Sequence, residues 1–390
     1  MSVTGARMMQ EALVVRPNVS TNSLRMSNET QTRRRFLQAT GMTAVTVGTA
    51  GCVALEAPAE GGENPAGITV DTGGESDQLV QLYESVAPAL VELSVETEFA
   101  EGGGSGFLVD EETIVTNAHV VMDVPSVDIR YQNLEWGEGS VVESDIYSDL
   151  AVIEPANPPE DVTLSLSDEL PTVGEQVMAI GAPLGFEGSA STGIVSGVNR
   201  TLPSPTGFAI PAAIQTDAAI NPGSSGGPLV RMDGSVTGVV FAGAGENVGL
   251  AISAKLARRV VPTLAAGDTY EHGYIGIEHR DVSPDIATAH DLDPPRGIYV
   301  ANVLDETPAE GVLRGGVEDA TIDGQPLQIG GDIILAVDGE ETPTGDHFAS
   351  YMSLETSPGD RVTFDIHRGG ERETVDLELA TRPEEIQPPR

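Results

Sequence analysis

The stretch Asn221–Pro228, which reads Asn-Pro-Gly-Ser-Ser-Gly-Gly-Pro, decides how the rest of this chain is interpreted. It places Ser225 in a glycine-rich turn, with Gly223 before it and two glycines directly after it. Glycine permits a tight turn and leaves room for a substrate backbone. N–H groups around such a serine can point at one spot, where a carbonyl oxygen becomes negative during acyl transfer. Because turns rich in glycine and serine are common, this stretch alone leaves a simple turn as an equal alternative.

A histidine and an aspartate upstream supply the other groups that a nucleophilic serine needs. His119 follows one short apolar run, and Asp149 directly precedes another. The order histidine, aspartate, serine is that of the chymotrypsin-type triad, and it differs between unrelated triad folds. The other five histidines all follow residue 270, so His119 is the only candidate base in the domain of Ser225. We therefore predict His119, Asp149 and Ser225 as the catalytic triad, with Asp145 as a competing carboxylate.

Five motifs in one order resemble the HtrA (Deg) family of serine proteases, over roughly residues 80–380. They are Gly103–Phe107, Thr116–Val120, Asp149–Val152, Gln215–Gly223 and Ser225–Leu229. One departure is Ser224, where the family usually has asparagine; this position supplies mainly backbone, so we expect the mechanism to survive. The resemblance implies a mostly β fold, with two six-stranded antiparallel β-barrels of the chymotrypsin type and the triad in the cleft between them.

The resemblance also implies roles for residues around the triad. The backbone N–H groups of Gly223 and Ser225 are expected to form the oxyanion hole, and the peptide of the Asn-Pro-Gly segment can flip between two states in this family. The segment Asn247–Ile252 matches the wall of the specificity pocket. Its centre is apolar, which predicts a preference for small aliphatic P1 side chains. The pocket residues are Val248, Gly249 and Leu250.

The hydrophobic pattern independently predicts many short strands separated by glycine and proline, which is typical of a barrel or sandwich. The predicted strands are 90–95, 106–109, 113–116, 127–131, 150–153, 176–180, 191–198, 228–230 and 236–241. A short helix is expected over 77–87. Another is expected over 253–266, with Ser253 as its N-cap and Gly267 as its stop.

A second series of motifs resembles a PDZ domain, a β-sandwich with helices. Tyr274, Ile275, Gly276 and Ile277 would form its carboxylate-binding loop, and the segment Phe348–Leu354 its groove-lining helix. Such domains bind C-terminal peptides by adding a strand to a sheet edge. The alternative for Tyr274–Ile277 is a buried strand with a bulge.

The composition is strongly acidic. The chain has 60 acidic and 20 basic residues, a formal charge of −40, and Lys255 is its only lysine. This charge argues against nucleic-acid binding, which needs clustered basic residues. Acidic residues spread over both domains indicate a protein adapted to high salt, where self-repulsion is screened. No metal-binding motif occurs in the protease half, and no phosphate-binding motif occurs in the chain, so neither a metal nor a cofactor is expected.

The N-terminal region has the pattern of an export signal. A twin-arginine-like stretch, Thr32–Gln38, precedes a short apolar run that ends at Cys52, the only cysteine. The residues before Cys52 resemble a lipobox, which predicts lipidation of Cys52 after removal of residues 1–51. The alternative is a cleaved secretory signal followed by an irrelevant cysteine. We expect an exported lipoprotein on the outer face of the cell membrane, with translation starting at Met26.

The predicted organisation therefore has five parts: a signal (1–51), an acidic tether (52–78), a protease domain (79–266), a PDZ domain (272–380) and a disordered tail (381–390). The predicted function is an ATP-independent serine endopeptidase for extracytoplasmic protein quality control. It would act on unfolded proteins or on proteins with exposed C-termini, and the resemblance implies a homotrimer. Two alternatives remain: a chaperone-like peptide-binding protein, and a regulatory protease that cleaves one partner at a specific site.

Overall fold

Strands far outnumber helices in the structure, as the sequence predicts. The computed structural model describes residues 73–96, 101–122, 124–182, 188–243, 248–322 and 325–383, all of which fall within one compact unit of the chain. The predicted signal, the predicted lipidation site Cys52, most of the predicted tether and most of the predicted tail lie outside these residues. Within them, no helix combines the length and the apolar character needed to cross a membrane.

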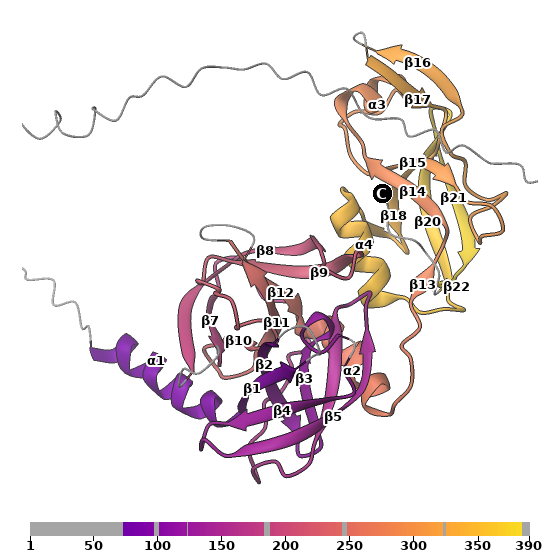
Figure 1. The fold of residues 1–390 in the computed structure, drawn as a ribbon. Coiled ribbons are helices and arrows are strands. Elements are labelled where there is room, and N and C mark those ends of the chain that lie inside the picture. Colours follow the sequence, from indigo (N-terminus) through magenta and orange to yellow (C-terminus); the bar gives the residue numbers. More distant parts are fainter. Residues whose placement is uncertain are drawn as a thin grey trace, which may run out of the picture. The chain divides into compact units, whose positions relative to one another are not determined.

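Six antiparallel strands close the first barrel in the order β1-β2-β3-β6-β5-β4 (Figure 1). Their bounds are β1 (Leu90–Glu96), β2 (Glu101–Asp110), β3 (Thr113–Asn117), β4 (Ser126–Tyr131), β5 (Trp136–Asp145) and β6 (Leu150–Pro155). Helix α1 (Gly73–Val86) and the 3₁₀ turn η1 (Ala87–Ala89) precede them, and η2 (Ala118–Val120) follows β3. Aliphatic side chains, Phe107 and Tyr131 of these strands are buried in a hydrophobic cluster that also includes side chains of the second barrel.

The second barrel is closed by six further strands in the order β10-β11-β12-β9-β8-β7. Their bounds are β7 (Gln176–Gly181), β8 (Ser189–Pro203), β9 (Ala209–Thr216), β10 (Pro228–Arg231), β11 (Val236–Gly243) and β12 (Gly249–Ser253). Helix α2 (Ala254–Ala265) follows directly. The Ser253 hydroxyl accepts a hydrogen bond from the Leu256 N–H at 3.3 Å, which confirms the predicted N-cap. Gly267 adopts φ +76° just past the helix, as a glycine stop requires.

The predicted strands are all present, but three barrel strands, β5, β9 and β12, were not predicted. Most positions of β5 are exposed or only partly buried, so the strand lacks a clear alternation of apolar and polar residues. In β9, Pro211 interrupts the pattern, because proline cannot donate a ladder hydrogen bond. Strand β12 begins at Gly249 and is buried throughout, so its short apolar run does not distinguish a strand from the start of α2.

The C-terminal part forms a sheet with strand order β14-β15-β18-β20-β21, in which β19 pairs with β18. Two small two-stranded sheets accompany it, β13–β22 and β16–β17. The strands are β13 (Gly273–Tyr274), β14 (Ile277–Asp281), β15 (Ile298–Val303), β16 (Glu318–Ile322), β17 (Gln325–Ile329), β18 (Ile333–Val337), β19 (Glu340–Glu341), β20 (Arg361–Arg368), β21 (Glu371–Glu378) and β22 (Ala380–Thr381). The helices are α3 (Pro284–Ala289) and α4 (Gly345–Glu355), and α4 includes the predicted groove helix.

Candidate active site

His119 and Asp149 form a closely hydrogen-bonded pair at the ends of two first-barrel elements. His119 lies in η2, directly after β3, and Asp149 directly precedes β6. One Asp149 oxygen lies 2.7 Å from His119 Nδ1, and the other accepts the His119 backbone N–H at 2.9 Å. Asp149 is completely buried. This geometry fixes the imidazole ring and its tautomer, which leaves Nε2 as the proton acceptor.

The backbone around Asp149 is held from β3. Asp149 adopts φ +54°, in the left-handed region that few non-glycine residues occupy. Its carbonyl oxygen accepts hydrogen bonds from the Ala118 N–H at 3.0 Å and from the Asn117 side-chain amide at 3.1 Å. These bonds offset the cost of the unusual backbone conformation, which is a common feature of functional sites.

Ser225 lies close to His119 but makes a different hydrogen bond. Both residues line a cleft of about 250 Å³, which is formed by residues of both barrels: Val95, Gly102, Gly103, His119, Val120, Met122 and Ser225. The Ser225 hydroxyl donates to the carbonyl oxygen of Phe241 at 2.5 Å, and the described residues include no hydrogen bond between Ser225 and His119. The Phe241 ring also contacts the imidazole edge-on, at 5.5 Å between centroids. The three predicted residues are thus brought together, but the serine hydroxyl points away from the base.

The turn around Ser225 is braced by the first barrel. Ser105 of β2 is fully buried, and its N–H donates to the Ser225 carbonyl oxygen at 2.8 Å. Its hydroxyl donates to the Gly223 carbonyl oxygen at 2.7 Å and accepts from the Ala182 N–H at 2.8 Å. Gly226 adopts φ +87°, and a side chain there would clash with the backbone of Ser105. The motif Gly103–Phe107 contains Ser105, but no sequence pattern predicted that Ser105 would hydrogen-bond to the Ser225 turn.

The predicted oxyanion-hole donors remain available. In the turn, the N–H groups of Ser224, Gly226 and Gly227 donate to backbone carbonyl oxygens. Those of Gly223 and Ser225 find no acceptor among the residues that the structure describes. Gly223 has φ +92°, a conformation that glycine adopts without strain. The two N–H groups can therefore serve an external oxygen.

The predicted specificity-pocket residues lie at the start of β12. Gly249 and Leu250 are buried, and Val248 is partly buried against the core. A side chain at Gly249 would press on Ile220 and on the carbonyl oxygen of Ala218. Glu246, which precedes this strand, lies outside the described residues.

Asp145, the competing carboxylate, lies in a different environment from Asp149. Its Oδ2 accepts hydrogen bonds from the Ser148 hydroxyl at 2.5 Å and the Ser148 N–H at 3.0 Å, and lies 2.8 Å from His272 Nε2. Burial alone would raise the pKa of Asp145, but the bonds from His272, Ser148 and Tyr147 outweigh it, so the pKa is lowered. The partner of this carboxylate is His272, not His119, and no sequence pattern indicated the pairing.

The C-terminal part has the features of a peptide groove. Strand β14 lies at the end of its sheet, so its outer edge is open within the described residues. The N–H groups of Ile275 and Gly276 donate to no described acceptor, while their carbonyl oxygens accept from Ala309 and Leu304. Gly276 has φ +81°, and a side chain there would clash with Thr307. The loop therefore presents free donors where the sequence placed a carboxylate site.

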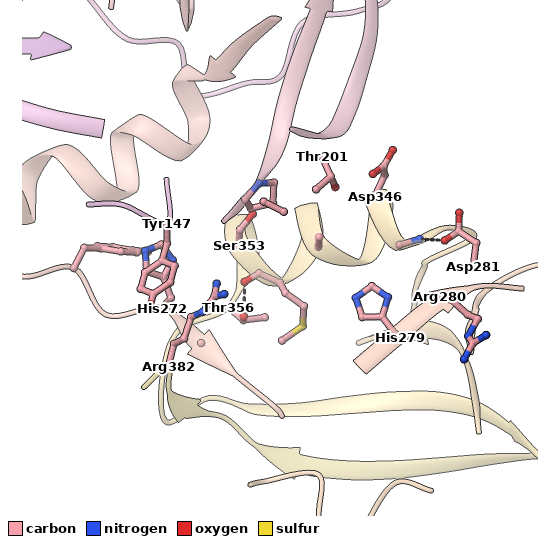
Figure 2. A pocket seen from close by; sticks show the side chains of 17 residues that line it. Tyr147, Thr201, His272, His279, Arg280, Asp281, Asp346, Ser353, Thr356 and Arg382 are labelled. Atoms are coloured by element: carbon pink, nitrogen blue, oxygen red, sulfur yellow. Dashed lines mark hydrogen bonds between the residues drawn. The ribbon is translucent and has the colours of Figure 1, made fainter. Parts of the chain in front are cut away.

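A cavity of about 510 Å³ lies beside β14 and α4 (Figure 2). His279, Arg280 and Asp281 of β14 contribute to one wall, and Figure 2 shows them near Asp346 of α4. The Gly345 N–H donates to the Asp281 carboxylate at 2.6 Å, which joins α4 to β14. Burial lowers the pKa of His279, against the opposing effect of Asp281. Protease residues, including Thr201 and Tyr147, complete the lining.

No cluster of three or more histidine, cysteine, aspartate or glutamate residues suited to a metal ion occurs among the described residues.

Comparison with known proteins identifies two domains. Residues 104–239 match the family model of a trypsin-like peptidase domain, and residues 273–379 match that of a PDZ domain. A probable periplasmic serine endoprotease DegP-like of Pseudomonas fulva is 36% identical over 291 residues, covering 73% of this chain and 57% of the relative. The chain thus spans a little over half the length of such bacterial relatives.

Other relatives match over more of their length. Protease Do-like 1, chloroplastic, of Arabidopsis thaliana is 30% identical over 334 residues, covering 80% of this chain and 74% of the relative. The solved structure of the HtrA-type protease AlgW with tripeptide has a TM-score of 0.63 at 28% identity, covering 78% of this chain and 97% of that one. The serine endoprotease from Yersinia pestis has a TM-score of 0.55 at 26% identity, covering 78% and 98% respectively. The match of sequence, domain order and fold leads to one conclusion: the chain belongs to the HtrA/DegP family of serine proteases.

Proposed function

We propose that this chain is a serine endopeptidase in which Ser225, His119 and Asp149 are the catalytic triad. The observation that carries the proposal is the double hydrogen bond between Asp149 and His119, at 2.7 and 2.9 Å, beside Ser225 in one cleft. Such an orientation lets the imidazole accept the serine proton and then deliver it to the leaving amine. Family membership supports the same reaction.

The proposed reaction follows from these positions. Ser225 first rotates from Phe241 towards His119, whose Nε2 takes the hydroxyl proton. The serine oxygen then attacks the peptide carbonyl, and the N–H groups of Gly223 and Ser225 stabilise the negative oxygen. Donors held ready for this charge typically contribute about 2.7–4 kcal/mol each to transition-state stabilisation. Collapse releases the amine and leaves an acyl-enzyme, which water hydrolyses through the same base.

The proposed substrates are unfolded proteins or proteins with exposed C-termini, handled without ATP in extracytoplasmic quality control. A free C-terminus would add a strand to β14, with its carboxylate on the N–H groups of Ile275 and Gly276. The apolar pocket wall formed by Val248, Gly249 and Leu250 favours small aliphatic P1 residues. Neither a metal nor a cofactor takes part in this mechanism.

We further propose that the protein is exported, anchored by a lipid on Cys52 and assembled as a homotrimer. The sequence before Cys52 supports the anchor. Relatives described as periplasmic endoproteases support export. The strong negative charge supports the proposal that the protein functions at high salt concentration.

A regulatory protease is the second candidate, because the Ser225 hydroxyl is engaged by Phe241. A serine hydroxyl bonded in this way is inactive, and a peptide bound in the groove beside β14 would be the activating ligand. The solved relative AlgW is described with a tripeptide, which supports a peptide ligand for this arrangement.

Casein cleavage in about 3 M KCl, where charges are nearly fully screened, tests the proposal. The wild type should cleave, and a fluorophosphonate should label Ser225. The Ser225→Ala variant should do neither. If this variant still prevents aggregation of unfolded proteins and the wild type cleaves nothing, the chaperone alternative is correct. If cleavage requires an added C-terminal peptide, the regulatory candidate is correct.

A further inference from the structure

The turn that carries Asp149 is organised by a second carboxylate. Asp145 ends β5, and four residues later Asp149 precedes β6. Within the turn, Asp145 accepts the Tyr147 N–H at 3.2 Å, the Ser148 N–H at 3.0 Å and the Ser148 hydroxyl at 2.5 Å. Ser148 is fully buried and directly adjoins Asp149. The Asp145 carboxylate therefore fixes the backbone on which Asp149 is presented to His119.

The two ends of the PDZ domain contact this same turn. Strands β13 and β22 pair with each other, and the Arg382 N–H donates to the His272 carbonyl oxygen at 2.9 Å. His272 Nε2 lies 2.8 Å from the Asp145 carboxylate. The Arg382 guanidinium stacks on the Tyr147 ring at 4.1 Å, and the Tyr147 hydroxyl donates to the Pro383 carbonyl oxygen at 3.1 Å. Figure 2 shows Tyr147, His272 and Arg382 gathered at one end of the cavity.

The contact between Asp145 and His272 is buried, so its loss would affect the position of the turn. The side chains of Asp145 and His272 are only 6% and 15% exposed. A buried carboxylate is costly unless hydrogen bonds satisfy it. Here the pKa of Asp145 is lowered despite burial, because the bonds from His272 and Ser148 favour the charged form. Loss of the His272 donor would leave the carboxylate under-satisfied and the turn free to shift.

The segment that carries His272 leads directly into the predicted carboxylate-binding loop of the PDZ domain. His272 is followed directly by β13, and β13 by Ile275 and Gly276, whose N–H groups donate to no acceptor in the described part of the chain. Ile275 and Gly276 thus lie three and four positions after His272, whose side chain holds Asp145. Asp149 lies four positions after Asp145.

We infer that Asp145 and His272 form a positioning pair, through which the entry strand of the PDZ domain holds the turn that presents Asp149 to His119. The inference rests on the proposed triad and adds two residues that touch neither substrate nor reacting atoms. It assigns His272 a role in turnover, although His272 lies outside the protease domain expected from the sequence.

Other contacts between the two domains provide a control. Lys255 of α2 pairs with Glu355 of α4 at 2.5 Å, and Arg259 donates to the carbonyl oxygens of Leu354 and Thr356. These contacts join the same domains through helix α2 and do not touch residues 145–149. Lys255→Gln thus removes one ionic contact between the domains without disturbing the turn.

The experiment compares wild type, His272→Leu, His272→Gln and Lys255→Gln in the full chain. It measures kcat and KM on a chromogenic peptide with P1 valine, the labelling rate of Ser225 by a fluorophosphonate, and the melting temperature. A catalytic group displaced by about 1 Å can lose up to roughly 100-fold, so we expect His272→Leu to lower kcat about tenfold, with KM changed less than about twofold. His272→Gln, which restores an N–H donor, should recover most of kcat. Lys255→Gln should match the wild type.

A double variant keeps the test decisive if His272→Leu is unstable. Losses at residues that act as one unit are not additive. His272→Ala alone should therefore lose about as much activity as His272→Leu, but combined with Asp145→Ala it should lose no more than Asp145→Ala alone. Four results would each overturn the inferred positioning pair. The first two are a wild-type kcat in His272→Leu and an equal loss of kcat in Lys255→Gln. The others are no recovery of kcat in His272→Gln at an unchanged melting temperature and an additive loss in the double variant. An inactive, unlabelled wild type instead overturns the proposed function, and the pair with it.

Discussion

The Ser225 hydroxyl donates its hydrogen bond to the Phe241 carbonyl oxygen, 2.5 Å away, while His119 is already oriented by Asp149. The proposed base and its carboxylate are therefore already paired, whereas the hydroxyl of the proposed nucleophile bonds elsewhere. Among the described residues the Ser225 hydroxyl makes this one hydrogen bond, so rotation of the side chain would free it for His119.

Replacement of any triad member by alanine should nearly abolish cleavage. Ser225→Ala and His119→Ala should each reduce kcat by about 10⁶-fold and Asp149→Ala by about 10⁴-fold, and pairs of these changes should cost little more than the worse single change, because the three groups act as one unit. Asp145→Ala should cost only about 10–100-fold, because it shifts the turn without removing a reacting group. Casein cleavage in molar salt measures this, and equal losses for Asp145→Ala and Asp149→Ala would mean that the third member is misassigned.

Ser105→Ala should lower kcat while KM stays nearly constant. The change removes the hydroxyl that bonds to Gly223 and to the Ala182 N–H, so the turn that presents the oxyanion donors loses its brace. Since a mispositioned oxyanion donor costs up to about 10²–10³-fold, we expect a loss of at least about tenfold. Ser140→Ala, on an exposed position of β5, serves as the control. Wild-type kinetics in Ser105→Ala would show that the brace is dispensable.

Asp145 should make stability depend on acid pH. Its pKa in the folded state is lowered below the usual value of 3.8, so its stabilising contribution is fully present above that value and is lost as the pH falls towards the folded pKa. Asp145→Asn, which does not ionise, should therefore show a smaller drop in melting temperature than the wild type between about pH 5 and pH 3. Thermal unfolding at constant high salt measures the difference, with Asp110→Asn as a control. Parallel profiles for wild type and Asp145→Asn would contradict the prediction.

Stability and cleavage should rise together with salt. Removal of residues 1–51 would leave 14 basic and 58 acidic residues, a net charge of −44. The range of charge repulsion is about 10 Å at 0.1 M salt and about 3 Å at 1 M, so salt should favour the compact fold and the association of subunits. Thermal unfolding and casein cleavage across about 0.1–3 M KCl provide the measurement. A melting temperature that is flat or falling over this range would exclude adaptation to high salt and leave the protease assignment intact.

Cys52→Ser should release the protein from membranes without loss of folding, because Cys52 precedes every element of the described fold. Fractionation at high salt, with the wild type as reference, shows whether the protein becomes soluble. Unchanged retention of the serine variant would place the anchor elsewhere.

The β architecture, the domain order and the residues proposed for the triad could all be predicted from the amino-acid sequence. These features follow from local rules: short apolar runs predict strands, glycines predict turns, and the order of His119, Asp149 and Ser225 is readable along the chain. The strands β5, β9 and β12 escaped prediction because their burial depends on neighbours in a closed barrel and leaves no clean alternation in the sequence.

The contacts between groups that are distant in the sequence depend on the packing of the folded chain. This packing paired Asp145 with His272 across 127 residues of chain, set Ser105 of the first barrel against the Ser225 turn of the second, and directed the Ser225 hydroxyl to Phe241. Such contacts join residues whose local sequences carry no shared pattern. A hydrogen bond depends on positions within a few tenths of an ångström, and those positions are set by the packing of two barrels and a PDZ domain.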